Sequence, residues 1–394
     1  MASIRKRIYR KKDGKESVYW QVSYYDAQGA RHKAQFKKQS QANALKIKVE
    51  GELFTGIHIP DANTMTVSSA CAMFIQDFEN LMKSGRRERS TFKQYRGHIK
   101  NHIKNSVIGD ILLTQLQAPH CRDFLDKLSS SSVSDTQAGK VMNTLRMIVG
   151  FSEERGWIRG NPARAVKVRR ETRKTSSIVI PPKEHVRALL QAAEAMGARE
   201  HAFVVLGVFC GLRPSELRGL TKEFVKPKYI TVEQRADQWG IIGKPKTEKS
   251  VRQIDIGAYS AKVVGKWVKL APHAFLFSTG NGRPENYQNL LSRFWLPLHR
   301  AAKLTVMVKE KEAPLYTMHT MRHVAASLWI EEGYNPKKVQ EMLGHSTLQM
   351  TMDTYGHLWH NPKEGRAIAN RAELSILGTK KAVKSPKALK KNKT

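Results

Sequence analysis

The stretch that decides how this chain folds is residues 315–357, LYTMHTMRHVAASLWIEEGYNPKKVQEMLGHSTLQMTMDTYGH. His319 and Arg322 are three residues apart, so on a helix their side chains share one face. An imidazole and a forked guanidinium that converge in this way suit a phosphate group. The phrase LGHS follows at residues 343–346, and Tyr355 lies ten residues after its histidine. If the chain folds back on itself, a hydrogen-bond donor and a nucleophile reach the same phosphate.

The charge of the chain favours a polyanionic partner. Its 394 residues carry 68 Lys and Arg against 34 Asp and Glu, a formal net charge of +34. This length is enough for two or three domains with their own cores. Nucleic acid is the expected partner. An anionic membrane surface is the alternative, but the basic runs lack the large apolar residues of a membrane-binding helix, and no apolar run approaches the roughly 20 residues that span a bilayer.

The cysteines and the first residues indicate a cytoplasmic protein. Cys71, Cys121 and Cys210 are widely separated and form no CxxC pair, which disfavours a disulfide framework and a thiolate zinc site. A reducing cytoplasm fits this pattern. Residues 1–7 are basic but lead into no apolar run, so they do not read as a secretion signal.

Residues 1–60 predict a small basic sheet followed by one helix. Three segments, 4–9, 17–25 and 31–36, alternate like strands and are separated by turn residues, and Ser40 begins a helix to residue 54. A β-ribbon can enter the major groove of DNA. The residues of this sheet that we expect to contact DNA are Arg5, Lys6 and Arg7. The alternative is a structural cap with a solvated basic face.

Residues 64–170 predict a bundle of helices. Thr66 caps the first, and apolar residues recur at intervals of three and four in segments 90–103, 119–128 and 134–155. Basic side chains interleave with the apolar face of the second helix, and a basic linker follows the bundle. The residues that we expect to contact DNA here are Lys93, Arg96, Lys100, Arg169, Arg170 and Arg173.

Residues 171–377 predict a domain that mixes helices with short strands. The expected elements are a buried helix at 203–210, strands at 229–232 and 250–256 with a turn at 243–247 between them, and helices at 260–270, 287–299 and through the opening stretch. Residues 378–394 are rich in Lys, contain no acid, and predict a disordered basic tail.

A second motif, GLRPSELRGL at residues 211–220, places another arginine at the N-terminus of a helix. Pro214 fits the first turn of a helix, so Arg213 lies just before that helix and is well placed for an anion. Glu216 either orients this guanidinium through a salt bridge or favours the helix N-terminus electrostatically.

These residues together suit attack on a phosphodiester. Guanidinium groups bind the equatorial oxygens where negative charge develops, and a tyrosine in positive surroundings can act as the nucleophile. The set consists of Arg213, Lys246, His319, Arg322, His345 and Tyr355. The sequence shows no Mg²⁺-binding acidic cluster, no HExxH and no GxxxxGK[ST] loop, so we expect no metal and no cofactor. His319 and His323 have the spacing of metal ligands, but no third ligand is evident.

The order and spacing of these motifs resemble the tyrosine recombinases, and more narrowly the integrases of phages and mobile elements. The motifs are Arg in GLRPSEL, a hairpin Lys followed by Ser and Arg, His-x-x-Arg, LGHS, and Tyr in TMDTYGH. The resemblance covers residues 178–377. The helical region before it resembles the family's core-binding domain, and the N-terminal sheet resembles its arm-binding domain.

The resemblance implies a multidomain fold that is mainly α with small β-sheets. An arm-type DNA-binding domain of three strands and a helix would occupy residues 1–60. A core-binding, SAM-like helical bundle would occupy residues 64–170. A mixed α+β catalytic domain of tyrosine-recombinase type would occupy 171–377, and the basic tail 378–394.

The resemblance also implies a role for each site residue. Arg213 and Arg322 would clamp the scissile phosphate while Tyr355 attacks it to form a 3′-phosphotyrosine. The roles of the others are general acid for Lys246, assistance in proton transfer for His319, and a hydrogen bond to a nonbridging oxygen for His345. Lys246 is preferred over the neighbouring lysines 244 and 249 because Lys-Thr followed by Ser and Arg matches the family's hairpin best.

The implied function is a site-specific DNA integrase that cleaves and rejoins strands to integrate a prophage or a genomic island, with excision left open. Its partners would be double-stranded DNA attachment sites and three further copies of the chain in a tetramer on DNA, in the cytoplasm and on the nucleoid when bound. Whether a directionality factor or a DNA-bending host protein takes part stays open.

Two other functions compete with integration. A type IB topoisomerase uses similar chemistry, but the arm-like sheet and the short chain favour the recombinase. A DNA-binding regulator that kept the fold and lost catalysis is disfavoured by the intact Tyr355 and both arginines.

Overall fold

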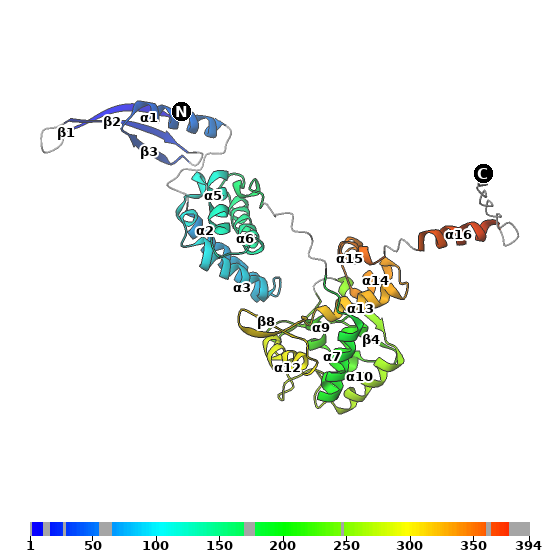
Figure 1. Ribbon diagram of the computed structural model, residues 1–394. Coiled ribbons are helices and arrows are strands. Elements are labelled where there is room, and N and C mark those ends of the chain that lie inside the picture. The colour runs from blue at the N-terminus through cyan, green and yellow to red at the C-terminus, as the bar shows by residue number, and fades with distance from the viewer. Residues whose placement is uncertain are drawn as a thin grey trace, which may run out of the picture. The chain divides into compact units, whose positions relative to one another are not determined.

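The computed structural model describes residues 2–10, 16–26, 29–54, 65–168, 178–245, 248–359 and 364–377 (Figure 1). The chain divides into two compact units, 1–173 and 174–394. Within the described residues the buried apolar side chains form separate clusters in the N-terminal sheet, in the helical bundle and in the second unit. Separate cores are what a multidomain chain requires.

The N-terminal region is the predicted sheet with one helix against it. The elements are β1 (Ser3–Arg10), β2 (Glu16–Tyr25), β3 (Arg31–Phe36) and α1 (Gln39–Phe54). The strands are antiparallel in the order β1-β2-β3. Ala42 and Val49 of α1 are buried with Val22 and Tyr24 of β2, so the helix covers one face of the sheet.

The helical bundle follows the predicted order. Its helices are α2 (Val67–Lys83), α3 (Arg89–His98), α4 (Val107–Asp110), α5 (Ala118–Ser129) and α6 (Asp135–Glu154), with a π-helical turn at Ile99–Ile103 and 3₁₀ turns at Leu113–Gln115 and Pro162–Arg164. The hydroxyl of Thr66 accepts a hydrogen bond from the Ser69 N–H, which caps α2 as the sequence predicts.

The second unit mixes helices with three small antiparallel strand pairs, β4–β7, β5–β6 and β8–β9. Its helices are α7 (Lys183–Met196), α8 (Ala198–Cys210), α9 (Pro214–Gly219), α10 (Ala258–Leu270), α11 (Tyr287–Leu290), α12 (Leu296–Ala301), α13 (Thr320–Glu331), α14 (Pro336–Leu343), α15 (Leu348–Tyr355) and α16 (Glu364–Leu377). Its strands are β4 (Tyr229–Val232), β5 (Arg235–Ala236), β6 (Ile242–Gly243), β7 (Arg252–Asp255), β8 (Thr305–Val308) and β9 (Lys311–Pro314). This mainly helical architecture with small sheets confirms the predicted fold class.

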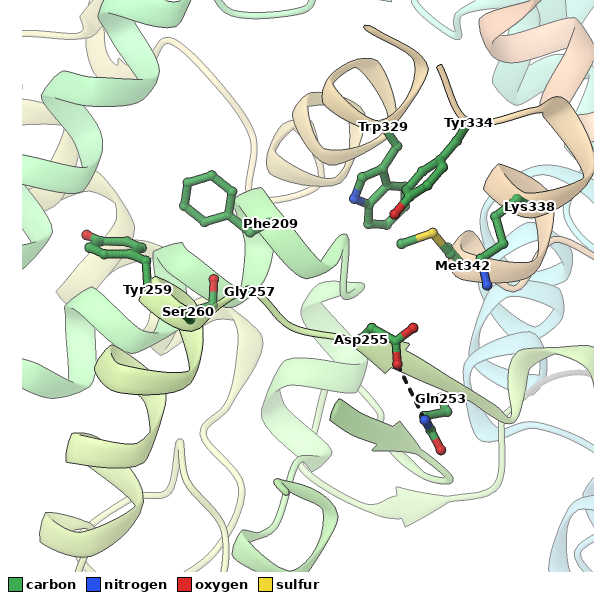
Figure 2. Close-up of a pocket in the computed structure, with 11 residues that line it drawn as sticks. Phe209, Gln253, Asp255, Gly257, Tyr259, Ser260, Trp329, Tyr334, Lys338 and Met342 are labelled. Carbon is green, nitrogen blue, oxygen red and sulfur yellow. Dashed lines mark hydrogen bonds between the residues drawn. The ribbon is translucent and has the colours of Figure 1, made fainter. Parts of the chain in front are cut away.

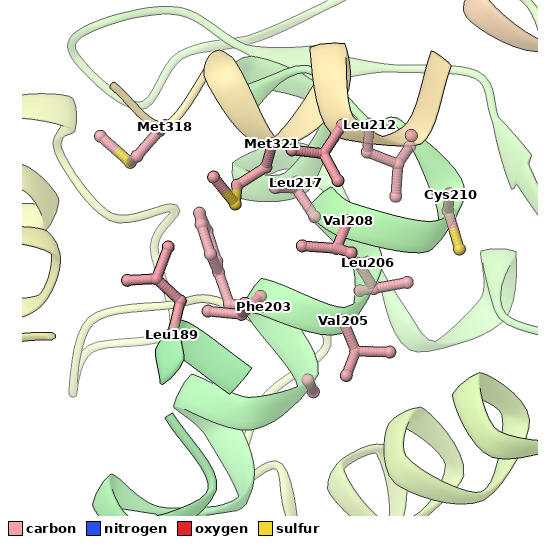
Figure 3. Close-up of a cluster of buried hydrophobic side chains, with 14 of the residues drawn as sticks. Leu189, Phe203, Val205, Leu206, Val208, Cys210, Leu212, Leu217, Met318 and Met321 are labelled. Atoms are coloured by element: carbon pink, nitrogen blue, oxygen red, sulfur yellow. The ribbon is translucent and has the colours of Figure 1, made fainter. Parts of the chain in front are cut away.

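Helix α8 forms the centre of this unit. From Ala202 to Cys210 it is apolar on all sides, as expected of a helix surrounded by others, and it packs against α7, α10 and α13. Figure 3 shows Phe203, Leu206 and Val208 of α8 in one cluster with Met318 and Met321, which flank the start of α13. The core therefore packs α8 against α13. The first arginine motif directly follows α8, and Arg322 lies in the first turn of α13.

Three parts of this unit differ from the sequence prediction. The β5–β6 pair was not predicted, because strands of two residues are too short to show an alternating pattern. The helix expected at 287–299 is interrupted by a π-helical turn, Leu291–Trp295, between α11 and α12. The β8–β9 hairpin was not predicted, because its turn residues Lys309 and Glu310 adopt positive φ angles of 47° and 62° without the Gly or Asn that usually marks such a turn. The tail expected at 378–394 lies outside the described residues.

No helix in the described part of the chain combines the length and the apolar character needed to cross a membrane.

Candidate active site

Gly211 sets the approach of the first arginine motif to α13. It ends α8 with φ +60°, and a Cβ at this position would lie 2.8 Å from the ring of Trp329. Only glycine therefore allows this close contact. Pro214 is the first residue of α9 and Arg213 is its N-cap, as the sequence predicts.

Glu216 lies between two guanidinium groups. Its Oε1 accepts hydrogen bonds from Nη1 of Arg213 at 2.6 Å and Nη1 of Arg252 at 3.1 Å. Its Oε2 accepts from the Arg213 backbone N–H and from Nη2 of Arg252, both at 2.9 Å. Both interpretations of Glu216 are observed, because it pairs with the Arg213 guanidinium and also accepts from the N-cap N–H of α9. Burial raises the pKa of Glu216, but Arg252 and then Arg213 outweigh burial and hold the pKa at about 2.

Three arginines hold the C-terminal end of α14. Each donates to a different one of three consecutive backbone carbonyls: Nε of Arg252 to Met342 at 2.7 Å, Nη2 of Arg322 to Leu343, and Nη2 of Arg213 to Gly344 at 3.1 Å. The last carbonyls of a helix have no partner within the helix, so these bonds satisfy them. The LGHS segment is thereby fixed to both arginine motifs and to β7.

Gly344 allows this packing. It adopts φ +65°, and a Cβ here would lie 3.1 Å from Cδ of Arg252. The next residue, His345, is buried, and its Nδ1 lies 2.9 Å from Oγ1 of Thr351 on α15. Burial first, and then the charge of Arg322, lower the pKa of His345 to about 3, so this imidazole is neutral at neutral pH.

Arg322 and His319 converge at the start of α13. The Arg322 side chain is buried, and its Nη1 donates to the Gly211 carbonyl at 2.8 Å. Burial, followed by the charge of Arg213, lowers the pKa of Arg322 to about 9, which leaves it charged at neutral pH. His319 is the N-cap of α13 and keeps an exposed surface. Desolvation of its ring, and then the charges of His323 and Arg322, lower the pKa of His319 to about 4.

Tyr355 is the last residue of α15, and its side chain is buried. Its Oη lies 2.7 Å from Nδ1 of His323. Burial raises the pKa of Tyr355 to about 12, against the opposing charges of Arg322 and Arg213. The phenol is therefore neutral here and needs a proton acceptor before it can act as a nucleophile.

Several predicted residues lie outside the described part of the chain: Lys246, Arg169, Arg170 and Arg173. On either side of Lys246, Lys244 is exposed, and Nζ of Lys249 donates to the Ser346 carbonyl at 3.0 Å. Lys249 therefore borders the LGHS segment.

The predicted DNA contacts of the N-terminal sheet fall on two faces. Side chains alternate along a strand, so Arg5 and Arg7 share one face and Lys6 lies on the other. Lys6 pairs in register with Trp20, which packs against the core beneath α1. In the helical bundle Lys93, Arg96 and Lys100 are all exposed, at intervals of three and four residues.

Sequence reasoning missed two residues of this site. His323 was considered only as a metal ligand, although its position next to Arg322, one turn after His319, indicated that it faces the same space. Arg252 served only to choose among the hairpin lysines. Its contact with Glu216 joins residues 36 positions apart and has no local sequence signal.

A groove of about 550 Å³ lies on another surface of this unit (Figure 2). Its lining includes four aromatic side chains, Phe209, Tyr259, Trp329 and Tyr334, together with Lys338. None of the described residues of the predicted site lines it. It adjoins the end of α14 through Met342, whose backbone carbonyl accepts from Arg252.

The charges of the cluster favour an anion. Arg213, Arg252 and Arg322 bring three positive charges to the single carboxylate of Glu216, and the histidines are held neutral. The two hydrogen bonds that Arg213 and Arg322 each make to the chain use only part of the five N–H groups of a guanidinium. A site of this kind can stabilise negative charge on phosphoryl oxygens.

Two family models match the chain. The model described as the phage integrase family matches residues 182–361, and the phage integrase N-terminal SAM-like domain matches residues 73–129. Among curated relatives, the "Tyrosine recombinase XerC-like" protein of Caldanaerobacter subterraneus is 24% identical over 88% of this chain and 94% of its own. The ICEBs1 integrase of Bacillus subtilis is 22% identical over 68% of this chain and 73% of its own.

Solved structures with the same fold are integrases bound to DNA. The Tn1549 transposon integrase with circular intermediate DNA has a TM-score of 0.63 at 20% identity, over 78% of this chain and 99% of that one. A lambda integrase tetramer on a Holliday junction has a TM-score of 0.55 at 19% identity, over 88% of this chain and 94% of that one.

Proposed function

The chain belongs to the tyrosine recombinase family, and from this premise we propose that it integrates a mobile DNA element by cutting and rejoining strands through Tyr355. The observation that carries the proposal is that Tyr355 lies buried where the charges of Arg322 and Arg213 of its own chain act on its phenol. The nucleophile and the clamp for the phosphate then belong to one protomer, which supports attack in cis.

In the proposed reaction the phosphate enters beside the two arginines. Arg213 and Arg322 bind its nonbridging oxygens, and His345, held by Thr351, donates a further hydrogen bond to one of them. The Oη of Tyr355 attacks the phosphorus, and the bond to the 5′ oxygen breaks. The product is a 3′-phosphotyrosine and a free 5′-hydroxyl, and the ester keeps the energy needed for rejoining.

Two protons move in this reaction. The leaving 5′ oxygen needs a proton, and we assign Lys246 as its donor because Lys249, three residues further along the chain, contacts the LGHS segment. The phenol must lose a proton, and the imidazole of His319 assists its transfer to solvent. Exposure of His319 at the start of α13 suits that role.

The element would be a prophage or a genomic island, and the active assembly would be four copies of the chain on paired DNA sites. By their names, the ICEBs1 and Tn1549 integrases belong to mobile elements, and the solved lambda integrase forms a tetramer on a Holliday junction. These likenesses support the same assignment for this chain.

We also propose that the N-terminal sheet binds a second class of DNA site. Its face opposite α1 presents Arg5 and Arg7 from β1 with Gln21 and Gln35, which pair in one row across the sheet with Arg5. Arg and Gln side chains can read guanine and adenine in the major groove.

Replacing Tyr355 with Phe tests the chemistry. Sequencing the junctions of the integrated element gives the core site, and a nicked duplex with this site traps the covalent intermediate. We expect Tyr355→Phe to bind this duplex like the wild type and to form no covalent complex, because the attacking oxygen is gone.

The matched control is Tyr334→Phe, which removes a hydroxyl from an exposed tyrosine of the aromatic groove. It should leave the yield unchanged. An undiminished covalent yield from Tyr355→Phe would refute the proposed nucleophile.

A further inference from the structure

We infer that His323 is a further catalytic residue, which accepts the hydroxyl proton of Tyr355 as the phenol oxygen attacks the phosphate. The inference rests on the proposed function, because it names the base that serves the proposed nucleophile. In this assignment His319 acts one step later, between His323 and solvent.

The contact is direct and comes from two different helices. His323 on α13 and Tyr355 at the end of α15 bring Nδ1 and Oη to 2.7 Å, with ring centroids 5.7 Å apart. That distance is within the range required of a general base. Because only 1% of the Tyr355 surface is exposed, bulk water does not reach the phenol freely, and the proton must pass to a neighbouring side chain.

The protonation state of His323 fits this role. Burial, and then the charge of Arg322, lower its pKa, so the imidazole is neutral at neutral pH. With its proton on Nε2, the neutral ring presents the Nδ1 lone pair to the phenol. The titratable and charged groups that face it are Tyr355 from α15 and His319 and Arg322 from α13. A bound phosphate would offset the charge of Arg322 and raise the proton affinity of His323 at the moment of attack.

The ring of His319 offers a path from His323 to solvent for the proton of Tyr355. His319 and His323 meet edge to face at 84°, with centroids 5.1 Å apart. Tyr355 is buried, His323 is half-buried and His319 is exposed, so the three side chains form a series from core to surface. His323, and not His319, therefore lies against the nucleophile.

The step balances without any further reactant. A lone pair on Oη of Tyr355 forms the bond to phosphorus as its proton moves to Nδ1 of His323, and the bond from phosphorus to the 5′ oxygen breaks. The 5′ oxygen takes its proton from the general acid. In rejoining, His323 as imidazolium returns its proton to the departing phenol oxygen.

Two substitutions separate proton acceptance from orientation. The amide oxygen of Asn can take the place of Nδ1 and accept the hydrogen bond of the phenol, but it cannot be protonated. We expect His323→Asn and His323→Ala to slow single-turnover cleavage of the core-site duplex by a similar factor, on the order of 10²–10⁴. Thermal midpoints and core-site binding equal to the wild type show that the variants are folded.

A changed leaving group separates base from acid. A 5′-bridging phosphorothiolate leaves as a thiolate and needs no proton, so it should restore cleavage by Lys246→Ala. It should not restore cleavage by His323→Asn, because the phenol proton is still held. Recovery of His323→Asn on this substrate would assign His323 to the leaving group and overturn the inference.

Two other results would overturn it. Cleavage by His323→Asn within about threefold of the wild type would mean that His323 only orients the phenol. If the variants fail the folding check, 3,5-difluorotyrosine at position 355 of the wild type replaces them: its more acidic phenol should weaken the loss of rate at acid pH, and an unchanged acid limb would count against a base. Absence of any covalent complex from the wild type would instead refute the proposed function.

Discussion

Glu216 shows how one buried carboxylate can control two arginines. It accepts four hydrogen bonds from Arg213 and Arg252, and these hold its pKa at about 2, below the ordinary 4.5. A carboxylate with a depressed pKa stabilises the fold above its unfolded-state pKa, and this stability is lost as the pH falls toward the folded-state value. The contribution is on the order of 3 kcal/mol.

Glu216→Gln should therefore destabilise the second unit at pH 7 by about 3–5 kcal/mol, because it leaves buried guanidinium groups unpaired. The difference from the wild type should shrink between pH 4.5 and 2, where the wild-type carboxylate takes up its proton. Urea unfolding at several pH values measures both effects.

The control is Glu184→Gln, which removes an exposed ion pair with Arg187 and should change stability by less than about 1 kcal/mol. A Glu216→Gln penalty that stayed constant from pH 7 to 2 would contradict the depressed pKa.

Single residues also show which features of the site could be predicted from the sequence. The position of Arg213 at the N-terminus of α9 was predictable, because Pro214 is typical of the first turn of a helix. The contact of His323 with Tyr355 was not predictable, because it depends on how α15 folds back on α13. The packing of Arg252 beneath Glu216 depends in the same way on tertiary structure. The roles of the six predicted site residues remain predictions.

Among the elements, the C-terminal end of α14 connects the segments that carry the site residues. Its last carbonyls accept from arginines on β7, on α13 and before α9, and Thr351 on α15 holds His345 directly after it. Many of the helices and strands could be predicted from periodicity and caps, but the β5–β6 and β8–β9 pairs could not. This convergence could not, because it requires the relative placement of segments up to 131 residues apart.

We predict that Arg252→Met lowers the cleavage rate by about 10²-fold, because Glu216 then pairs with Arg213 alone and α14 loses one anchor. Arg252→Lys keeps the charge but cannot reach Glu216 and the Met342 carbonyl together, so it should fall between Met and wild type. Core-site affinity should stay within a few-fold, since Arg252 is buried.

Arg300→Met serves as the control, because Arg300 forms an exposed ion pair with Glu312. It should cleave at the wild-type rate. Wild-type cleavage by Arg252→Met would contradict a role of β7 in the site.

For the whole molecule, separate cores mean that one part can be removed without unfolding the rest. Deletion of residues 1–54 should abolish footprints at a second class of DNA site and leave the core-site footprint. Binding should weaken steeply with salt, because a chain of net charge +34 displaces many counterions.

Single substitutions test which face of the sheet is used. Arg5→Ala and Arg7→Ala should weaken binding to the second site and reduce its salt slope, whereas Lys6→Ala, on the face toward α1, should do neither. Identical footprints from the full-length and shortened proteins would contradict a separate DNA site for the sheet.

The proposed reaction depends on one bond, between Tyr355 and a DNA 3′-phosphate. After reaction with the nicked core-site duplex, nuclease and trypsin digestion should release the peptide of residues 339–363, in which Tyr355 is the only tyrosine. Tandem mass spectrometry should place the nucleotide on Tyr355 through its 3′-phosphate, and the other DNA end should carry a free 5′-hydroxyl. A nucleotide on another residue, or a linkage through a 5′-phosphate, would contradict the account.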